Sequence, residues 1–503
     1  MNILNYLRED ADKYPDKTAV SDENISLSFS ELELYARQTG QFITDTLKGS
    51  GPVPIGVFAD HDCYSIAAFL GIVMSGNFYV PLDPKQPLNK LEKILADAEP
   101  LLVLGRSGEE GLLPEGYKAQ FKDIEDACTS GGASTCNIEE YEADRPLYMV
   151  YTSGSTGYPK GVLKSHGAMI DFVSAFTDTF ETGSNEVMGS QTPFFFDASA
   201  KDIYLMLKTG ATLHIIPEEK FLLPPMLIRF LDEKKITFIS WVPSALSLIA
   251  QYNTFSEMIP KTLKKVFFVG EAFPVKHLKK WQEALPDVTY VNMYGASELA
   301  GICCYYIVPD HYDKDTDIPM GKPLKNCKVF LAERYEKSPE GIRIINEPGK
   351  NGEIYLSSRA LALEYYNDPE KTKGAFIEIN GERIFRTGDI AWYDEEGDLH
   401  FAARNDSQIK HMGQRIELGE IESVCLTLPV IDRACCLYDQ GKKRIYLFCQ
   451  LSEGANEDQK SILIKLKQIL VYYMMPQRVV IMDRLPLNAN GKTDRQLLKE
   501  KMK

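Results

Sequence analysis

The sequence predicts an α/β protein with a large multi-layer N-terminal domain and a small C-terminal α/β domain. Its 503 residues are more than one hydrophobic core usually accommodates. Apolar, strand-like runs alternate with helical patterns as far as residue 300, which is typical of α/β layering. From Lys325 the pattern changes to short alternating segments with turns at Pro348-Gly and Asn351-Gly, so we expect a β-rich subdomain near 325–400.

The individual helices and strands are predicted from apolar runs and from the capping residues and prolines that bound them. Ser30 is placed at a helix N-cap because its hydroxyl can accept a hydrogen bond from the first turn, and prolines end the strand that follows Gly76. In chain order the sequence predicts a helical stretch over 3–40 broken near Pro15, a strand near Ala19–Val20, a helix from Ser30 to Ile43, strands over 53–58 and 76–84, a helix over 64–74, a surface loop over 107–137, a helix–strand–helix run over 225–251 with its strand at 236–242, and a strand over 266–269. After Arg404-Asn-Asp the tail returns to a mixed α/β pattern.

The composition is that of an ordinary globular protein. Apolar residues make up 44% of the chain and charged residues 25%. No stretch approaches the roughly 20 apolar residues of a membrane span, and acidic residues near the N-terminus argue against an export signal. Neither the ten cysteines nor the seven histidines show metal-binding spacing. We therefore expect a cytoplasmic protein with buried free thiols, no membrane span and no metal site built by the protein alone.

Charge is unevenly distributed along the chain. The net charge is −15, which argues against nonspecific binding of nucleic acid. Residues 404–503 contain 17 Lys and Arg and 12 Asp and Glu, a net of +5, so residues 1–403 carry −20. A basic C-terminal module on an acidic body makes an acidic partner for that module plausible, with Lys442-Lys-Arg444 as its densest basic run.

The stretch Tyr151–Gly161 carries the first chemical signal. It holds three glycines, two serines and two threonines, follows a short apolar run and contains Lys160. Free amide N–H groups, hydroxyls and one ammonium are the parts that wrap a polyphosphate. A flexible Gly/Ser linker is the alternative, although a linker needs neither the lysine nor the preceding strand. The stretch does not satisfy the Walker A pattern.

This stretch resembles the phosphate loop of the adenylate-forming (ANL) superfamily, and six further segments match that family in order. They cover nearly the whole chain. They are Gly76–Pro87 with its Tyr-Val-Pro-Leu-Asp-Pro, Asn292-Met-Tyr-Gly-Ala-Ser-Glu298, Arg386-Thr-Gly-Asp389, Arg404-Asn-Asp406-Ser-Gln-Ile-Lys, Gly413-Gln-Arg-Ile-Glu-Leu-Gly-Glu-Ile-Glu422 and Asn490-Gly-Lys492-Thr-Asp-Arg495. The layout is similar to D-alanine–carrier protein ligases and freestanding nonribosomal-peptide adenylation enzymes.

The resemblance implies ATP and Mg²⁺ as cofactors. It assigns catalytic roles to Lys160 and Lys492, the latter stabilising charge at the substrate carboxylate and α-phosphate. Glu298 becomes the Mg²⁺ ligand, with a surface acid as the alternative. Asp389 would hold the ribose hydroxyls from a Thr-Gly turn at a strand end. The full nucleotide set is Thr152, Ser153, Gly154, Ser155, Thr156, Gly157, Asn292, Met293, Tyr294, Gly295, Ala296, Ser297, Asp389, Arg404 and Lys492. Ala296 and Ala403 depart mildly from the family, which usually has proline and glycine there.

Substrate class depends on Asp197, which resembles the aspartate that receives the α-ammonium group in amino-acid-activating members. An aspartate among aromatic residues needs a cation, and a substrate ammonium would supply one. The alternative is an aspartate that caps the following helix. The resemblance lines the side-chain pocket with Asp197, Lys201, Ser240, Phe267, Val269, Met293, Gly301 and Ile302.

Lys201 leaves two interpretations open. It points outward into solvent or pairs with Asp202 or another acid, or it enters the pocket and selects an acidic or strongly hydrogen-bonding side chain. Val269 differs from the cysteine associated with D-alanine ligases, so D-alanine is possible but not required.

The expected reaction has two steps. ATP and an amino acid give aminoacyl-AMP and pyrophosphate, and a phosphopantetheine thiol on a separate carrier protein then takes the aminoacyl group, since no carrier attachment site follows Lys492. The family implies a core over 1–403, a hinge over 404–408 containing Asp406, and a mobile lid over 409–503 that rotates between the steps. An acyl- or aryl-CoA ligase is the closer alternative, opposed by Asp197, and a noncatalytic sensor is the more distant one.

Overall fold

The computed structural model describes residues 2–49, 51–130, 136, 138–153, 158–252, 254–312, 314, 317–334, 341–404, 408–486 and 493–502. The chain divides into two units. The first comprises Met1–Pro84, Asp97–Tyr151 and Gly161–Ala403, and the second Lys85–Ala96, Thr152–Lys160 and Arg404–Lys503. The α/β class is confirmed, whereas the hinge and the mobility of the lid stay predictions.

The first unit contains two largely parallel sheets. One has the strand order β15 (Lys322–Pro323), β14 (Cys304–Ile307), β13 (Thr289–Tyr294), β12 (Lys265–Val269), β11 (Phe238–Trp241), β9 (Val187–Ser190), β10 (Thr212–Ile215), β1 (Thr18–Ser21) and β2 (Ser26–Ser28). The other has the order β19 (Glu364–Tyr365), β8 (Lys160–Ser165), β7 (Pro146–Thr152), β4 (Phe78–Leu82), β3 (Pro54–Phe58), β5 (Leu102–Gly105) and β6 (Gln120–Asp123). The strands β1, β10, β9, β11, β12 and β13 run parallel, so their carboxyl ends meet at one edge of the sheet.

A third, antiparallel sheet forms the β-rich portion that the sequence predicts. Its order is β17 (Ile342–Ile345), β16 (Cys327–Arg334), β18 (Gly352–Ser358), β21 (Glu382–Tyr393) and β20 (Phe376–Ile379), with β22 (Leu399–Arg404) also paired to β21. Short alternating segments separated by turns produce this hairpin-rich arrangement.

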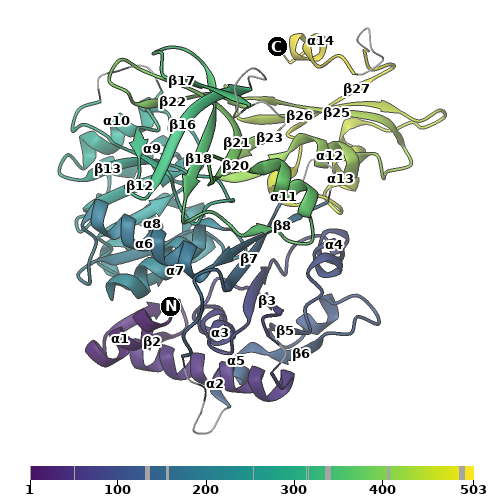
Figure 1. The fold of residues 1–503 in the computed structure, drawn as a ribbon. Helices are drawn as coiled ribbons and strands as arrows, with labels where there is room; N and C mark the ends of the chain where they lie inside the picture. The colour runs from purple at the N-terminus through teal and green to yellow at the C-terminus, as the bar shows by residue number, and fades with distance from the viewer. Residues whose placement is uncertain are drawn as a thin grey trace. The chain divides into compact units, whose positions relative to one another are not determined.

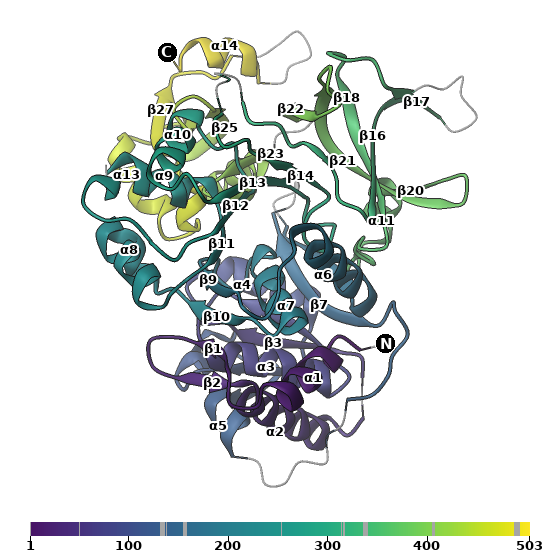
Figure 2. The same cartoon turned by 90° about the vertical axis from the view of Figure 1, so that its left-hand side faces the viewer.

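The helices of the first unit cover its sheets. They are α1 (Asn5–Lys13), α2 (Phe29–Leu47), α3 (Cys63–Met74), α5 (Ile124–Thr129), α6 (His166–Phe180), α7 (Ala198–Thr209), α8 (Pro224–Glu233), α9 (Pro243–Gln251), α10 (Val275–Ala284) and α11 (Pro369–Ala375), with 3₁₀ turns η1 (Glu109–Leu112), η2 (Glu218–Leu222) and η3 (Thr254–Ser256). The helix α4 (Leu88–Ala98) falls mostly within the second unit. Figure 1 shows α3 and α5 beside β3, β5 and β6, and Figure 2 shows α6 and α7 beside β7.

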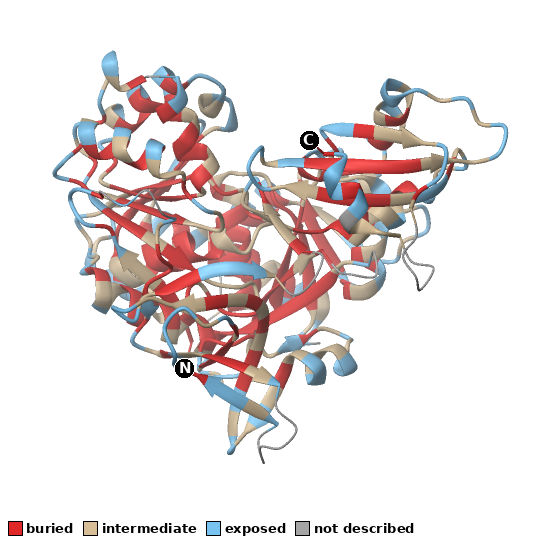
Figure 3. Ribbon diagram, turned by 90° about the horizontal axis from the view of Figure 1, so that it is seen from above, coloured by how far each residue is buried: buried red, intermediate tan, exposed pale blue. Residues whose placement is uncertain are grey.

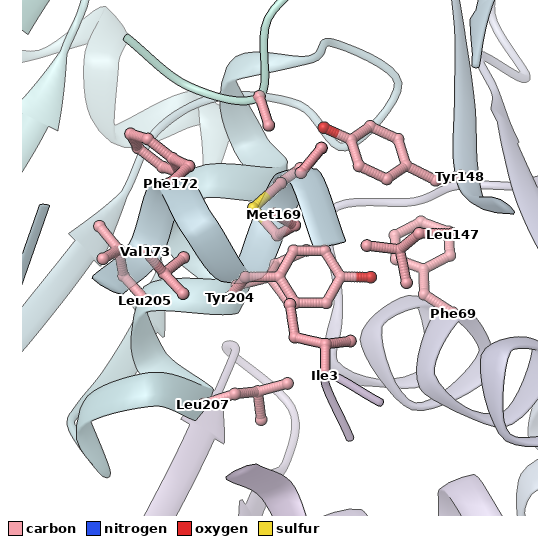
Figure 4. Close-up of a cluster of buried hydrophobic side chains, with 14 of the residues drawn as sticks. Ile3, Phe69, Leu147, Tyr148, Met169, Phe172, Val173, Tyr204, Leu205 and Leu207 are labelled. Carbon is pink, nitrogen blue, oxygen red and sulfur yellow. The ribbon is translucent and has the colours of Figure 1, made fainter. Parts of the chain in front are cut away.

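The largest core is shared by both parallel sheets and by α6 and α7. Figure 4 shows part of it, where Tyr148 of β7 lies near Tyr204 of α7 and Met169 of α6, all three of them buried. The rings of Tyr148 and Tyr204 stack with centroids 6.4 Å apart. The strands of these sheets are largely buried (Figure 3), as expected for parallel sheets with helices on their faces.

The C-terminal part of the second unit is a small α/β assembly. It contains the hairpin β23 (Gln408–His411) and β24 (Gln414–Glu417), the sheet β25 (Ile431–Asp439), β26 (Arg444–Leu451) and β27 (Arg478–Met482), helices α12 (Leu418–Cys425), α13 (Gln459–Leu466) and α14 (Arg495–Glu500), and the 3₁₀ turn η4 (Tyr472–Met474). Mixed α/β character in the tail is therefore confirmed.

Two local expectations are wrong. Ser28, not Ser30, is the N-cap of α2: its hydroxyl accepts from the Glu31 amide while the Glu31 carboxylate accepts from the Ser28 amide, a reciprocal capping box. The span 107–137 is not a continuous loop, because it contains η1, β6 and α5. Asp123 accepts a hydrogen bond at the start of α5, and Ile124 and Ala127 of that helix are buried. Cys128 is buried there as well.

Two expectations from composition can be checked on the described residues. All ten cysteines are free thiols, and nine of them are buried, Cys136 being the half-buried one. Within the described ranges, no helix is both long and apolar enough to cross a membrane.

Candidate active site

Asp197 lies in the first unit, where it meets a cation from the chain itself. It immediately precedes α7, and its Oδ1 accepts hydrogen bonds from Lys164 Nζ at 2.5 Å and from the Tyr148 hydroxyl at 3.0 Å. The Asp197 side chain makes no hydrogen bond that caps α7, so the capping alternative is not supported. The substrate ammonium at Asp197 stays a prediction, and the structure adds that the carboxylate already has a cation in Lys164.

Lys164 is held deep inside the protein by β8. Its side chain is 0% exposed, whereas that of Asp197 is 16% exposed. Its ammonium group also donates to the carbonyl oxygen of Leu299 at 2.9 Å and lies 5.4 Å from the centre of the Tyr148 ring. Burial lowers the pKa of Lys164 and raises the pKa of Asp197, and each charge opposes the shift of the other. Sequence reasoning missed this lysine, although a lysine within a buried strand is itself an unusual signal.

Glu298 is also buried in the first unit. Its side chain is inaccessible to solvent, its Oε1 accepts a hydrogen bond from the Tyr365 hydroxyl at 2.7 Å, and its backbone oxygen accepts from the Ala362 amide at 2.9 Å. The alternative of a surface acid is therefore wrong. Among the described residues, no group of three or more His, Cys, Asp or Glu side chains could hold a metal ion.

Tyr294 and Asp389, both predicted at the nucleotide, contact each other. Tyr294 ends β13, and its hydroxyl donates to Asp389 Oδ2. Burial raises the pKa of Tyr294 well above its usual value, so this hydroxyl stays protonated and able to donate. Asp389 is 1% exposed. The sequence thus brings the tyrosine and the aspartate of two separate motifs to one place.

A bulge in β21 positions Asp389. Glu353 of β18 pairs with Ile390 and Tyr355 with Arg386, so β21 has three residues where β18 has one. Gly388 in this bulge has a φ of 74°, a conformation that favours glycine. The Asp389 amide donates to the Thr387 hydroxyl at 3.0 Å. Asp389 therefore lies within a strand, and the expectation that it lies at a strand end is wrong.

The remaining nucleotide residues are divided between the two units. Asn292, Met293, Gly295, Ala296 and Ser297 belong to the first unit with Tyr294 and Asp389, whereas Thr152, Ser153, Lys160 and Arg404 belong to the second. Gly154, Ser155, Thr156, Gly157, the hinge residue Asp406 and the catalytic candidate Lys492 lie outside the described residues.

The described part of the predicted phosphate loop contains an unsatisfied hydroxyl. Thr152 ends β7, and its buried Oγ1 has no hydrogen-bond partner among the described atoms. Ser153 donates from its hydroxyl to the carbonyl oxygen of Arg415 at 2.6 Å, and Lys160 begins β8 with its side chain buried. A buried hydroxyl with no acceptor fits a site that takes an oxygen-rich ligand such as a phosphate chain.

Four members of the predicted side-chain pocket lie on the adjacent parallel strands β11, β12 and β13. Ser240 pairs in register with Phe267, and Val269 with Met293. Phe267 is at the middle of β12, whereas Ser240, Val269 and Met293 lie in the carboxyl-terminal halves of their strands, where open α/β sheets bind ligands. The Ser240 hydroxyl is buried and, among the described atoms, has no hydrogen-bond partner, so it is an orphaned polar group in an otherwise apolar set.

Gly301 and Ile302 follow Glu298 in the connection between β13 and β14. Gly301 has a φ of 80°, and a Cβ there would lie 2.2 Å from the ring of Phe172, which Figure 4 shows in the core. Only glycine fits this approach. Ile302 is buried.

Lys201 forms a buried ion pair with Asp202. Their charged groups are in contact, and each side chain is 3% exposed. Burial raises the pKa of Asp202, and the charge of Lys201 opposes that rise. The solvated interpretation of Lys201 is wrong, and the pairing with Asp202 is confirmed.

Comparisons with known proteins identify the family. The model of the AMP-binding enzyme family matches residues 7–366, and that of the AMP-binding enzyme C-terminal domain matches 420–492. The chain is 32% identical to an L-proline–[L-prolyl-carrier protein] ligase of Streptomyces coelicolor over 88% of this chain and 86% of that one. It is 30% identical to a ligase of the same description from Pseudomonas fluorescens over 96% of each chain.

A solved structure has the same fold as this chain. The fold matches holo-PA1221, a nonribosomal peptide synthetase protein containing adenylation and PCP domains, with a TM-score of 0.82 and 25% identity over 99% of this chain and 84% of that one. The predicted arrangement of a large α/β body and a small C-terminal domain is the architecture of these enzymes. The chain therefore belongs to the AMP-binding enzyme family.

Proposed function

We propose that the protein activates a carboxylic substrate of the amino-acid class with ATP and transfers the resulting aminoacyl group to the phosphopantetheine thiol of a separate carrier protein. The match to two ligases of this kind over nearly their full lengths is the observation that carries the proposal. The partly buried carboxylate of Asp197 and the buried carboxylates of Glu298 and Asp389 support it, because they stand at the positions where the family resemblance expects the substrate ammonium, the metal ion and the ribose.

In the first step a carboxylate oxygen of the substrate attacks the α-phosphorus of ATP, and the bond to pyrophosphate breaks. In the second step the carrier thiol loses its proton, its sulfur attacks the acyl carbon, and AMP leaves. Neither step changes an oxidation state. We assign the stabilisation of negative charge to Lys160 and Lys492, the latter from the family resemblance.

Side chains of the first unit fit the nucleotide and its metal ion. Asp389 would accept hydrogen bonds from the ribose hydroxyls, with Tyr294 fixing its orientation. Glu298 would supply one oxygen ligand to a Mg²⁺ that the triphosphate brings, and Tyr365 orients that carboxylate.

We further propose that the carrier is acidic and that the enzyme works in a reducing compartment such as the cytoplasm. The net charge of +5 over residues 404–503 supports the first point. Ten free cysteines support the second.

An acyl- or aryl-CoA ligase remains the second candidate, favoured by one observation. The case against a substrate without an ammonium group assumed that Asp197 has no cation within the protein. Lys164 supplies that cation, so the case no longer holds. Substrate-dependent pyrophosphate exchange, run over a panel of D- and L-amino acids and simple carboxylic acids, tests the proposal. Amino-acid-dependent exchange is expected, and a protein that binds ATP but exchanges with none of the acids would contradict it.

A further inference from the structure

The Lys164–Asp197 pair places a positive charge at the carboxylate that the family resemblance assigns to the substrate's ammonium group. The ammonium of Lys164 lies 2.5 Å from Asp197 Oδ1 and 2.9 Å from the Leu299 carbonyl oxygen. It is 0% exposed, so water does not reach it. The pair therefore lies inside the first unit and is not a contact between surface side chains.

Other buried groups of the first unit also act on this pair. Tyr148 donates its hydroxyl to the same Oδ1, and burial raises its pKa, so it adds a dipole and no charge. Figure 4 shows the Tyr148 hydroxyl at the edge of the apolar cluster. Glu298 adds a charge that acts on both members and raises the pKa of each. Glu298 is itself oriented by Tyr365.

This charge arrangement changes what the site demands of a substrate. If Asp197 had no cation in the protein, binding a substrate without an ammonium group would leave its negative charge buried and uncompensated. That would weaken the binding of such a substrate. Lys164 removes that cost. A substrate ammonium would instead be a second cation beside Lys164, sharing the same carboxylate.

We infer that Lys164 is a specificity-determining residue that removes the requirement for an α-ammonium group, so that the enzyme also activates monocarboxylic acids with a neutral α-substituent, such as 2-hydroxy acids. The inference rests on the proposed adenylation function and extends its substrate class. The chemistry is unchanged: the carboxylate oxygen of the acid displaces pyrophosphate from the α-phosphorus of ATP and gives an acyl-AMP.

The test compares matched acids. Pyrophosphate exchange is measured for each L- and D-amino acid and for the 2-hydroxy acid with the same side chain, for example alanine and lactate. For the best side chain, the wild-type enzyme should show kcat/KM values for the two acids within about tenfold of each other. Exchange with an amino acid that exceeds its 2-hydroxy counterpart by more than about a hundredfold would overturn the inference and leave the proposed function intact.

Variants separate the charge of Lys164 from its packing. Lys164→Met should raise the preference for the amino acid by on the order of tenfold or more, because Asp197 then needs the substrate's cation. Lys164→Met with Asp197→Asn should return the preference to near the wild-type value, and Lys164→Arg should retain it. Lys265→Met is the matched control, since Lys265 of β12 pairs with Glu186 at 2.7 Å and lies outside the predicted site.

Each outcome bears on the inference. An unchanged preference in a folded Lys164→Met enzyme, or an equal change in the Lys265 control, would overturn it. If Lys164→Met does not fold, the wild-type ratio alone decides. Absence of exchange with every acid of both series would overturn the inference together with the proposed function, which distinguishes that failure from the loss of 2-hydroxy acids alone.

Discussion

The hydroxyl of Tyr294 donates a hydrogen bond to the carboxylate of Asp389, although the two residues are 95 positions apart in the chain. The tyrosine comes from the end of a parallel strand and the aspartate from a bulge in an antiparallel one. The contact therefore joins two sheets of the first unit at a point that we assign to the ribose of ATP.

Removing that hydroxyl should weaken the protein measurably. Tyr294→Phe leaves a buried carboxylate short of one donor, and a hydrogen bond to a charged group contributes about 1.5–3 kcal/mol. We expect the free energy of unfolding in urea to fall by that amount. Tyr312→Phe is the control, because its hydroxyl donates to the neutral Asp317 carbonyl oxygen at 3.2 Å. An equal fall in the free energy of unfolding in both variants would show that the charge of Asp389 adds nothing to the strength of this hydrogen bond.

The Lys201–Asp202 pair should contribute to stability through its burial. Lys201→Met leaves Asp202 charged and without its cation in a site where both side chains are 3% exposed. Breaking a buried ion pair in this way costs about 3–5 kcal/mol. Lys201→Met combined with Asp202→Asn should recover a large part of that loss in urea unfolding. A single variant as stable as the wild type would contradict the buried pairing.

His166 should make the first unit sensitive to acid. Its Nδ1 accepts a hydrogen bond from the Ile3 amide at 3.3 Å, and burial, helped by Arg145, lowers its pKa from 6.5 to about 3. Because the pKa is lowered in the folded state, His166 binds a proton in the unfolded chain at pH values where it stays neutral in the folded chain. The stability is therefore present above pH 6.5 and is lost as the pH falls toward 3.

The measurement compares unfolding of the wild type and of His166→Asn at pH 7 and pH 4. Between pH 7 and pH 4 the free energy of unfolding of the wild type should fall by about 3 kcal/mol more than that of the variant. This is the part of the effect of the lowered His166 pKa that has developed by pH 4. Identical pH dependence in the two proteins would contradict the buried, neutral state of His166.

Charge reversal in the C-terminal region tests the proposed docking of an acidic carrier. Lys442 and Arg444 are exposed at the turn between β25 and β26, and Lys442 pairs with Asp439 at 3.5 Å. Lys442→Glu with Arg444→Glu should slow carrier loading several-fold at low salt, and the difference should shrink at high salt. Lys460→Glu with Lys467→Glu makes the same charge change at exposed positions of α13 and its C-cap. Unchanged loading in the first variant would exclude this turn as the docking site.

Local sequence patterns predicted much of the fold. The strand over 53–58 and the helix over 64–74 are confirmed as β3 and α3. Continuous apolar runs of those lengths are typical of a buried strand and a buried helix. The N-cap of α2 was misplaced by two residues because Ser28 and Ser30 are both hydroxyl residues and only the reciprocal bond with Glu31 distinguishes them.

The site was predicted less completely, for a physical reason. Motifs identified Asp197, Glu298 and Asp389 singly, yet their partners Lys164, Tyr365 and Tyr294 come from other strands and connections. Such pairings depend on how strands cross and bulge, which periodicity does not encode. Lys164 was missed because nothing in the motifs of the phosphate loop marks a lysine four residues beyond Lys160.

The central claim is that one chain both activates an acid with ATP and passes it to a carrier thiol. The intact mass of a phosphopantetheinylated carrier protein, measured after incubation with the enzyme, ATP, Mg²⁺ and the acid that gives the fastest pyrophosphate exchange, tests both steps at once. The account predicts that the carrier gains the mass of one acyl group, that omission of ATP prevents the gain, and that Lys492→Ala prevents it unless preformed acyl-AMP is supplied. A carrier of unchanged mass, with coenzyme A acylated in its place, would contradict the account.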